Sequence, residues 1–252
     1  MLFLKILTIL MISTSLHAEE RKIEDIYKLN NIKGSILIES ADGRITYQHN
    51  INDKEAFIPA STFKIANTLI ILEEGLIKDQ SEVIKWDGKE REYASWNKDQ
   101  TLKSAFHHSC VWCYQRYARQ VGDKKYHTYL RKLNYGNFLT GSDVVRFWLD
   151  GDLRISVKEQ INFLRKVHTE DLPIQKQHIN TLKNIMLSEE NKNYRIWSKT
   201  GWSGKDGWYV GYLVIDDQTW YFANHIEIHK KSDLEFRKKL TIETLKILDI
   251  IQ

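Results

Sequence analysis

Strand patterns lie near both ends of this 252-residue chain, and helical patterns fill the middle. Apolar alternation predicts a hairpin over residues 34–48, with its turn at Asp42-Gly43, and further strands between residues 195 and 228. Residues 61–190 show helical periodicity interrupted by polar breaks. Strands at both ends with helices between them indicate one antiparallel sheet built from distant segments. We therefore predict an α+β fold in which the intervening helices form a second lobe.

The predicted organisation is a single domain over residues 19–252, with a cleft between its two lobes. The sheet lobe comprises residues 19–60 and 191–252, and the mostly helical lobe comprises residues 61–190. Terminal helices are expected to flank the sheet. The last of them is predicted to open at Ser232–Glu235, which has the pattern of a capping box.

The composition excludes several classes of protein. With 42% hydrophobic and 12% aromatic residues, the chain does not have the composition of a disordered protein. Two prolines and twelve glycines leave no material for a long flexible linker. The formal charge of +4 is mild and the charges alternate along the chain, so no nucleic-acid partner is expected.

The first eighteen residues have the pattern of a secretory signal peptide. Lys5 gives a positive start, Ile6–Leu16 is mostly apolar, and the composition changes abruptly after Ala18. The alternative is an uncleaved membrane anchor, but eleven apolar residues are too few to span a bilayer. We therefore expect a secreted protein of the bacterial periplasm without a stable membrane anchor.

The segment Pro59-Ala60-Ser61-Thr62-Phe63-Lys64 opens an apolar helix that is expected to run to Gly75. A helix that is apolar nearly all round is buried, and a lysine on it is unfavourable unless it is neutralised or paired. Ser61, Lys64 and Thr68 nevertheless form a polar stripe at helical spacing. Because Lys64 lies one turn from Ser61, its amine can serve as the base for that hydroxyl group. The alternative is that Ser61 is an ordinary N-cap.

A second signal is Lys199-Thr200-Gly201, at the end of a predicted strand. A cation, a hydroxyl group and a glycine can dock an anionic, extended substrate along a sheet edge, because glycine permits close backbone approach. Alone, this tripeptide is more typical of a strand-ending turn. Combined with Ser-x-x-Lys at an earlier helix start, it resembles the signature of the penicilloyl-serine transferases, which include β-lactamases and penicillin-binding proteins.

Further motifs in a fixed order narrow this resemblance. They are Ser109-Cys110-Val111, Tyr135-Gly136-Asn137, the tryptophan-bearing Phe147–Gly151, Trp208–Gly211 and Arg237. Over essentially the whole chain after residue 18, the sequence resembles the class D β-lactamases, or oxacillinases. The resemblance implies a β-lactamase-like fold and a small-molecule β-lactam substrate.

The resemblance also implies roles for the residues at the centre of the site. Ser61 is expected to open the β-lactam ring and to become an acyl-ester. Lys64 is expected to be N6-carboxylated by carbon dioxide or bicarbonate and to act as the general base; no other cofactor is implied. Trp148 is expected to hold the carbamate through its indole N–H, with Val111 lying over it. The structural alternatives are that Trp148 and Val111 are simply core residues.

Other matching residues are expected to bind substrate or to move protons. Ser109 and Lys199 would relay a proton to the departing ring nitrogen. Thr200 and Arg237 would hold the substrate carboxylate, and the backbone amides of the nucleophile and of Trp202 would form the oxyanion hole. The alternative for Arg237 is a solvated surface charge.

Cys110 and Cys113 need a separate interpretation. With His107 and His108 they place four possible metal ligands within seven residues, a segment too short to wrap readily around zinc, so no metal site is predicted. A thioredoxin-like redox motif is disfavoured because no βαβ pattern surrounds the pair. Thiols spaced i,i+3 on a helix can approach each other, but free buried cysteines are the expected outcome.

Three functions are compatible with these motifs. The favoured one is an exported enzyme that hydrolyses penicillin-type, and in particular oxacillin-type, β-lactams. The others are a penicillin-binding sensor and a D-alanyl-D-alanine peptidase-like protein, both of which acylate without rapid turnover. A sensor domain of this type follows a long membrane-embedded module, whereas this domain is expected to start directly after the signal peptide. A peptidase would favour Ser-x-Asn over Ser109-Cys110-Val111, and the match Ser95-Trp96-Asn97 comes early in the helical lobe. The sequence is compatible with a monomer or a homodimer.

Overall fold

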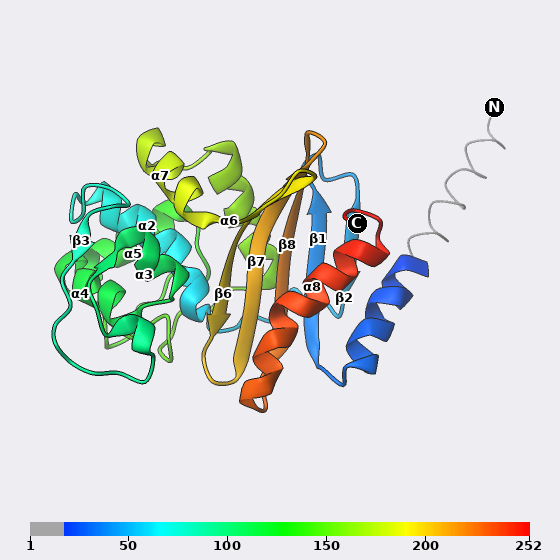
Figure 1. Ribbon diagram of the computed structural model, residues 1–252, viewed down its shortest axis with the longest axis horizontal. Helices are drawn as coiled ribbons and strands as arrows, with labels where there is room; N and C mark the ends of the chain where they lie inside the picture. Colours follow the sequence, from blue (N-terminus) through cyan, green and yellow to red (C-terminus); the bar gives the residue numbers. More distant parts are fainter. Residues whose placement is uncertain (1–17) are drawn as a thin grey trace.

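The computed structural model describes residues 18–252, so the predicted signal peptide, apart from Ala18, lies outside the described residues. Six strands form an antiparallel sheet in the order β2-β1-β8-β7-β6-β5 (Figure 1). Their bounds are β1 (Gly34–Ser40), β2 (Thr46–His49), β5 (Leu187–Glu190), β6 (Tyr194–Trp202), β7 (Asp206–Ile215) and β8 (Gln218–Glu227).

The sheet joins the two ends of the chain, as the sequence predicts. Strand β1 pairs with β8 along its whole length, so that Leu37 lies opposite Ala223. The β1–β2 turn contains Gly43 in the left-handed region, with φ of 69°. The α+β prediction is therefore confirmed, because most helices come from the chain between β2 and β5.

Helices surround the sheet and form the second part of the molecule (Figure 1). They are an N-terminal helix (residues 18–29), η1 (Ala60–Phe63), α2 (Lys64–Glu73), η2 (Ala94–Trp96), α3 (Leu102–His107), α4 (Val111–Val121), α5 (Asp123–Leu133), α6 (Val157–Thr169), α7 (Lys176–Met186), η3 (Lys231–Glu235) and α8 (Phe236–Ile247). A small ladder pairs β3 (Val83–Ile84) with β4 (Gln100–Thr101). No helix within residues 18–252 is both long and apolar enough to cross a membrane.

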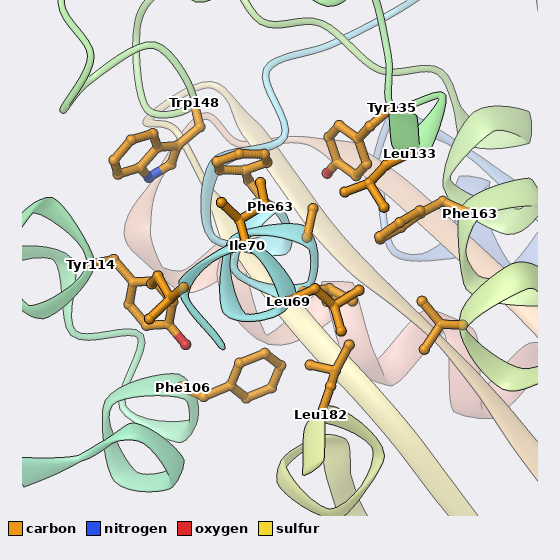
Figure 2. Packing of buried hydrophobic residues seen from close by; sticks show 14 of the residues in the cluster. Phe63, Leu69, Ile70, Phe106, Tyr114, Leu133, Tyr135, Trp148, Phe163 and Leu182 are labelled. Atoms are coloured by element: carbon orange, nitrogen blue, oxygen red, sulfur yellow. The ribbon is translucent and has the colours of Figure 1, made fainter. Parts of the chain in front are cut away.

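The sheet separates two apolar cores, because successive side chains of a strand point to opposite faces. On one face, Ile36 and Ile38 pack in a cluster with Leu240 and Leu245 of α8. Leu37 points to the other face and joins the larger cluster, which contains α2, α6 and the other helices of the middle segment. Figure 2 shows side chains of α2 at the centre of this larger core.

Helix α2 is buried almost throughout because apolar residues cover it on all sides, and Lys64 is buried with them. The segment begins as the short 3₁₀ helix η1 and continues as α2 up to Glu73. Gly75 follows with φ of 64°, and the amide of Leu76 donates to the carbonyl of Ile71. The predicted helix end at Gly75 is confirmed.

Two predicted boundaries are wrong. Leu187–Glu190 is an edge strand of the sheet, although these residues were expected in the helical lobe. The predicted capping box at Ser232–Glu235 does not form, because these residues lie inside the 3₁₀ helix η3. The Asp233 carboxylate accepts from the amides of His229 and Lys230 instead, since a carboxylate can satisfy two free N–H groups at once.

Candidate active site

Ser61 and Lys64 lie together where η1 passes into α2. The Lys64 amine, Nζ, donates to the Ser61 hydroxyl oxygen at 3.1 Å. The N-cap positions of the two helices are Pro59 and Phe63, and neither has a side-chain cap. Ser61 is therefore not an N-cap, and its hydroxyl group faces the lysine.

Lys64 is completely buried, and this burial lowers the pKa of its amine to about 7. The Nζ atom lies 5.0 Å from the centre of the Tyr114 ring. The Tyr114 hydroxyl group is 2.8 Å from the hydroxyl oxygen of Thr68, the third member of the predicted polar stripe. The apolar helix thus holds an amine that is substantially neutral near neutral pH.

Lys199 makes a second lysine–serine contact from β6. Its Nζ atom donates to the Ser109 hydroxyl oxygen at 2.5 Å and to the carbonyl of Thr200 at 3.0 Å. Burial lowers the pKa of Lys199 well below its usual value, and the positive charges of Lys64 and Arg237 lower it further. Ser109 itself lies in the turn between α3 and α4, in the left-handed region with φ of 53°.

Gly201 allows β6 to run directly against η1. A Cβ atom at this position would lie 2.9 Å from the Pro59 carbonyl oxygen and 3.3 Å from the Thr62 amide nitrogen. The pairing of β5 with β6 ends at Trp197, so η1 lies along the remaining part of that strand. The glycine therefore brings the chain before Trp202 next to the chain that carries the nucleophile.

Arg237 is placed over the end of β6 rather than in solvent. Its Nε atom donates to the Leu234 carbonyl at 2.7 Å, and its Nη1 atom donates to the Gly201 carbonyl at 2.8 Å. Burial lowers the pKa of this guanidinium group to about 10, so it remains charged at neutral pH. The alternative of a solvated surface charge is therefore excluded.

These residues meet at a pocket of about 520 Å³. The predicted residues that line it are Ser61, Ser109, Val111, Thr200, Gly201, Trp202 and Arg237. The buried Lys64 and Lys199 do not line the pocket but contact Ser61 and Ser109, respectively, which do. The remaining lining residues were not predicted as site residues from the sequence: they are Glu92, Tyr93, Trp96, His108, Leu149, Lys231 and Leu234. Most of them come from irregular segments or short 3₁₀ helices, where no periodic pattern marks an inward face.

Trp148 lies in the core beside the pocket. It is fully buried, and its ring centre lies 5.6 Å from that of Phe63, the residue before Lys64 (Figure 2). Its indole N–H is buried without a hydrogen-bond partner within residues 18–252. A buried donor without a partner is unfavourable, so this nitrogen is poised to bind an acceptor.

Cys110 and Cys113 form a disulfide bond, so the prediction of free thiols is wrong. The expectation rested on helical spacing, in which both residues belong to the same regular helix. Cys110 is instead the non-helical N-cap of α4, with ψ of 105°, which lets its side chain reach Cys113 in the first turn. With both sulfurs bonded to each other, the pair is not available to a metal.

The chain is similar in sequence and structure to proteins of one family. Residues 26–246 match the family described as the penicillin binding protein transpeptidase domain. Beta-lactamase OXA-48 of Klebsiella pneumoniae is 43% identical over an alignment of 201 residues, which covers 78% of this chain and 76% of that protein. Beta-lactamase OXA-2 of Salmonella typhimurium is 33% identical over an alignment of 252 residues, which covers 97% of this chain and 92% of that protein.

Solved structures agree with this similarity. The class D β-lactamase YbXI from Nostoc superposes with a TM-score of 0.87 and 36% identity, over 90% of this chain and 98% of that one. FUS-1 (OXA-85), a class D β-lactamase from Fusobacterium nucleatum, superposes with a TM-score of 0.88 and 31% identity, over 92% and 99% of the two chains. This chain belongs to the class D serine β-lactamases.

Proposed function

We propose that this protein hydrolyses β-lactam antibiotics through an acyl-ester on Ser61. The observation that carries the proposal is the contact of 3.1 Å between the Ser61 hydroxyl oxygen and a fully buried Lys64 amine. A base acts best when its pKa lies near the working pH, and burial lowers the pKa of Lys64 to about 7. The relatives described above carry the name β-lactamase, which supports the same reaction here.

In acylation, the Ser61 oxygen attacks the β-lactam carbonyl carbon while its proton moves to the base on Lys64. The ring C–N bond then breaks, and the ring nitrogen receives a proton from Lys199 through the Ser109 hydroxyl group. The Lys199 Nζ atom lies 2.5 Å from the Ser109 hydroxyl oxygen. The amides of Ser61 and Trp202 stabilise the oxyanion. The proton held by the Lys64 base then passes to Lys199 and restores it. The free base takes a proton from water as the water attacks the ester, and this proton goes to the Ser61 oxygen as the product leaves.

The substrate carboxylate binds at the Arg237 end of the pocket. Arg237 is charged and partly desolvated, and Thr200, which carries a hydroxyl group, lines the same pocket. A charge-assisted hydrogen bond is roughly twice as strong as a neutral one. The other walls are largely apolar, formed by Tyr93, Trp96 and Leu149 among others. These walls suit penicillins with bulky apolar side chains, as in oxacillin.

The working base is Lys64 in its N6-carboxylated form. A neutral amine reacts with carbon dioxide to give a carbamate and a released proton, and burial keeps much of Lys64 neutral near pH 7. The carbamate supplies the anionic base that an amine lacks. The unpartnered, buried N–H of Trp148 fits an acceptor of this kind. We place this chemistry in the bacterial periplasm, in agreement with the predicted signal peptide.

Turnover of a chromogenic cephalosporin tests the proposal. The wild-type protein is expected to release product continuously, and mass spectrometry is expected to show a covalent penicillin adduct on slow substrates. Ser61→Ala is expected to lose both activities while remaining folded, since its hydroxyl group caps no helix. A single stoichiometric burst would show a sensor or peptidase-like protein instead. Adduct formation by Ser61→Ala would disprove the assignment of the nucleophile.

A further inference from the structure

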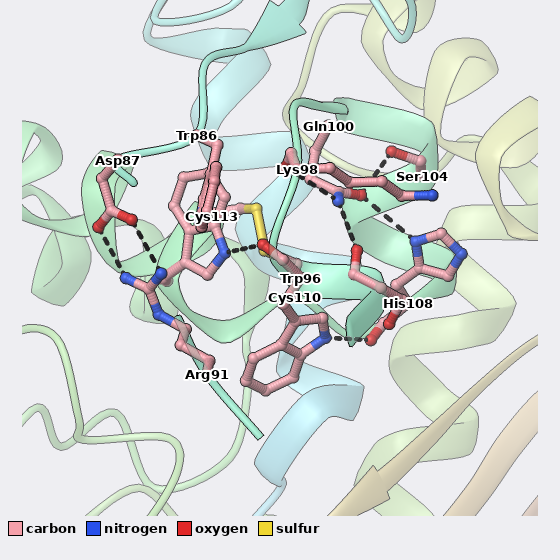
Figure 3. The surroundings of a disulfide bond; sticks show 12 residues. Trp86, Asp87, Arg91, Trp96, Lys98, Gln100, Ser104, His108, Cys110 and Cys113 are labelled. Carbon is pink, nitrogen blue, oxygen red and sulfur yellow. Dashed lines mark hydrogen bonds and ion pairs between the residues drawn. A yellow bond between two sulfur atoms is a disulfide. The ribbon is translucent and has the colours of Figure 1, made fainter. Parts of the chain in front are cut away.

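The disulfide bond lies between the residues that border the pocket. Cys110 separates Ser109 from Val111 in the chain, and both of these neighbours line the pocket. Cys113 lies in the first turn of α4, and both cysteines are fully buried. The bond therefore spans the point at which the chain enters α4 (Figure 3).

This entry point has an unusual backbone. Ser109 adopts the left-handed region with φ of 53°, which is unfavourable for residues other than glycine. The amides of Ser109 and Cys110 donate to the carbonyls of Phe106 and Ala105, at 3.1 and 2.8 Å. These bonds close the end of α3 and turn the chain, so that the Ser109 hydroxyl oxygen lies 2.5 Å from Lys199 Nζ.

Helix α4 begins without the usual side-chain cap. Its N-cap, Cys110, makes no side-chain hydrogen bond to the first-turn amides, and its ψ of 105° is not helical. Helix ends without a cap tend to fray, because the first amides have no partner within the helix. The covalent bond from Cys110 to Cys113 ties the N-cap to the first turn and takes the place of a cap.

The same turn also fixes one wall of the pocket. The indole N–H of Trp96 donates to the His108 carbonyl at 2.8 Å, and the indole N–H of Trp112 donates to the Trp96 carbonyl at 3.0 Å. His108 precedes Ser109 in the chain and Trp112 follows Cys110, so Trp96 is held from both sides of this turn. Trp96 also lines the pocket (Figure 3). Movement at the start of α4 would displace both the serine and this wall.

We propose that the Cys110–Cys113 disulfide positions Ser109 for proton transfer from Lys199 during acylation. Cys110 and Cys113 are positioning residues, since neither touches the reacting atoms. The bond closes a very short loop and so restricts the unfolded chain little, which makes its effect mainly local. The inference rests on the proposed function, because it assigns to Ser109 and Lys199 the protonation of the ring nitrogen.

The test compares the acylation rate constant of the oxidised and the reduced protein. Dithiothreitol supplies two electrons and two protons, which convert the disulfide into two thiols, and becomes its own cyclic disulfide. Reduction is verified by a mass gain of two hydrogen atoms. The double variant Cys110→Ala/Cys113→Ala provides the bond-free state if the buried bond resists the reagent. Labelling with a fluorescent penicillin measures acylation, and product release measures deacylation.

We expect loss of the bond to slow acylation by about tenfold or more, since small misplacements of catalytic groups have effects of this size. Deacylation is expected to change by less than about twofold, because Lys64 rather than Ser109 serves that step. The double variant is expected not to respond to dithiothreitol. Equal acylation rates with and without the bond would overturn the proposal, as would equal slowing of both steps with a large fall in melting temperature.

Ser109→Ala provides the matched control. If the bond acts mainly through Ser109, reduction is expected to slow the residual acylation of this variant by less than about twofold, the part that movement of the Trp96 wall accounts for. A decrease as large as that of the wild-type protein would also overturn the proposal. Failure of the proposed function has a different signature, because the oxidised wild-type protein would then bind fluorescent penicillin without releasing product, while the ratio of acylation rates would still report on the disulfide.

Discussion

Lys64 and Lys199 each point a buried amine at a serine hydroxyl group, and their environments differ. Lys64 lies in an apolar helix beside Tyr114, and burial alone lowers its pKa. Burial also lowers the pKa of Lys199, and the charges of Arg237 and of Lys64 in its protonated form lower it further. The basic groups around the pocket favour an anionic substrate, since a carboxylate relieves their mutual repulsion.

Arg237 and Lys199 are expected to differ in the kinetic step that they affect. Arg237→Ala removes a charge-assisted contact with the substrate carboxylate and is expected to raise KM about tenfold or more, with a smaller change in kcat. Lys199→Ala removes a proton donor and is expected to slow acylation by about a hundredfold. Steady-state and single-turnover kinetics with benzylpenicillin separate the two effects. An unchanged acylation rate in Lys199→Ala would make the Lys199–Ser109 contact structural.

Carboxylation of Lys64 is expected to depend on the indole N–H of Trp148. Activity lost after mild acid exposure is expected to return with bicarbonate, because carbamate formation is reversible. Trp148→Phe keeps most of the ring but removes the donor, so it is expected to need about tenfold more bicarbonate for half-recovery. It is also expected to slow deacylation more than acylation. Full activity in carbon-dioxide-free buffer, with Lys64 shown by spectroscopy to be unmodified, would contradict the carbamate mechanism.

Among the contacts between secondary-structure elements, the one between η1 and β6 assembles the site. The 3₁₀ helix carries Ser61, and the strand carries Lys199 through Trp202. The two approach closely at Gly201, where a side chain would meet the backbone of Pro59 and Thr62. Backbone cannot move aside as a flexible side chain can, so the distance between these elements depends on this glycine.

Gly201→Ala is expected to reduce kcat/KM by about tenfold or more, because it separates the Ser61 and Trp202 amides that we propose as the oxyanion hole. Gly211→Ala is a suitable control. It lies on β7, away from the pocket lining, and its new Cβ would clash with the Trp197 carbonyl oxygen. The control is expected to lower the melting temperature with little change in the activity of the folded fraction. The reverse pattern in the two variants would contradict this view of the η1–β6 contact.

At the scale of the whole molecule, the buried Lys64 is expected to lower the free energy of unfolding. Within residues 18–252 the buried Lys64 has no ion-pair partner, and a lysine of this kind is unfavourable when protonated. The pKa of Lys64 falls from 10.5 to about 7 on folding. Between pH 7 and pH 10.5 the unfolded chain binds one proton more than the folded protein at Lys64, so the free energy of unfolding increases with pH. The loss of stability caused by burying Lys64 is therefore greatest below pH 7 and disappears above pH 10.5.

Lys64→Met is therefore expected to be inactive but more stable than the wild-type protein. At pH 7 in carbon-dioxide-free buffer, the gain in free energy of unfolding is expected to be on the order of 4 kcal/mol, from 1.36 kcal/mol per pKa unit. The gain is expected to shrink as the pH approaches 10. Urea denaturation at several pH values measures it, with Lys54→Met, at an exposed lysine, as the control. A pH-independent difference would show that burial does not lower the pKa of Lys64.

The sequence alone determined the α+β class, the meeting of the chain ends in one sheet and the pairing of Ser61 with Lys64. These follow from local rules, because periodicity specifies which face of an element is buried and helical spacing places Lys64 one turn from Ser61. The resemblance to the class D β-lactamases also predicted Ser109, Lys199 and Arg237 as site residues.

Only the tertiary structure decided how these residues meet. The Lys199–Ser109 contact joins residues 90 positions apart, and the Arg237–Gly201 contact spans 36 positions. No periodic pattern predicts such distances, since they depend on how whole elements pack. The disulfide and the edge strand β5 were missed for a related reason. Each requires a local departure from regular helix, and tertiary packing rather than intrinsic propensity selects such departures.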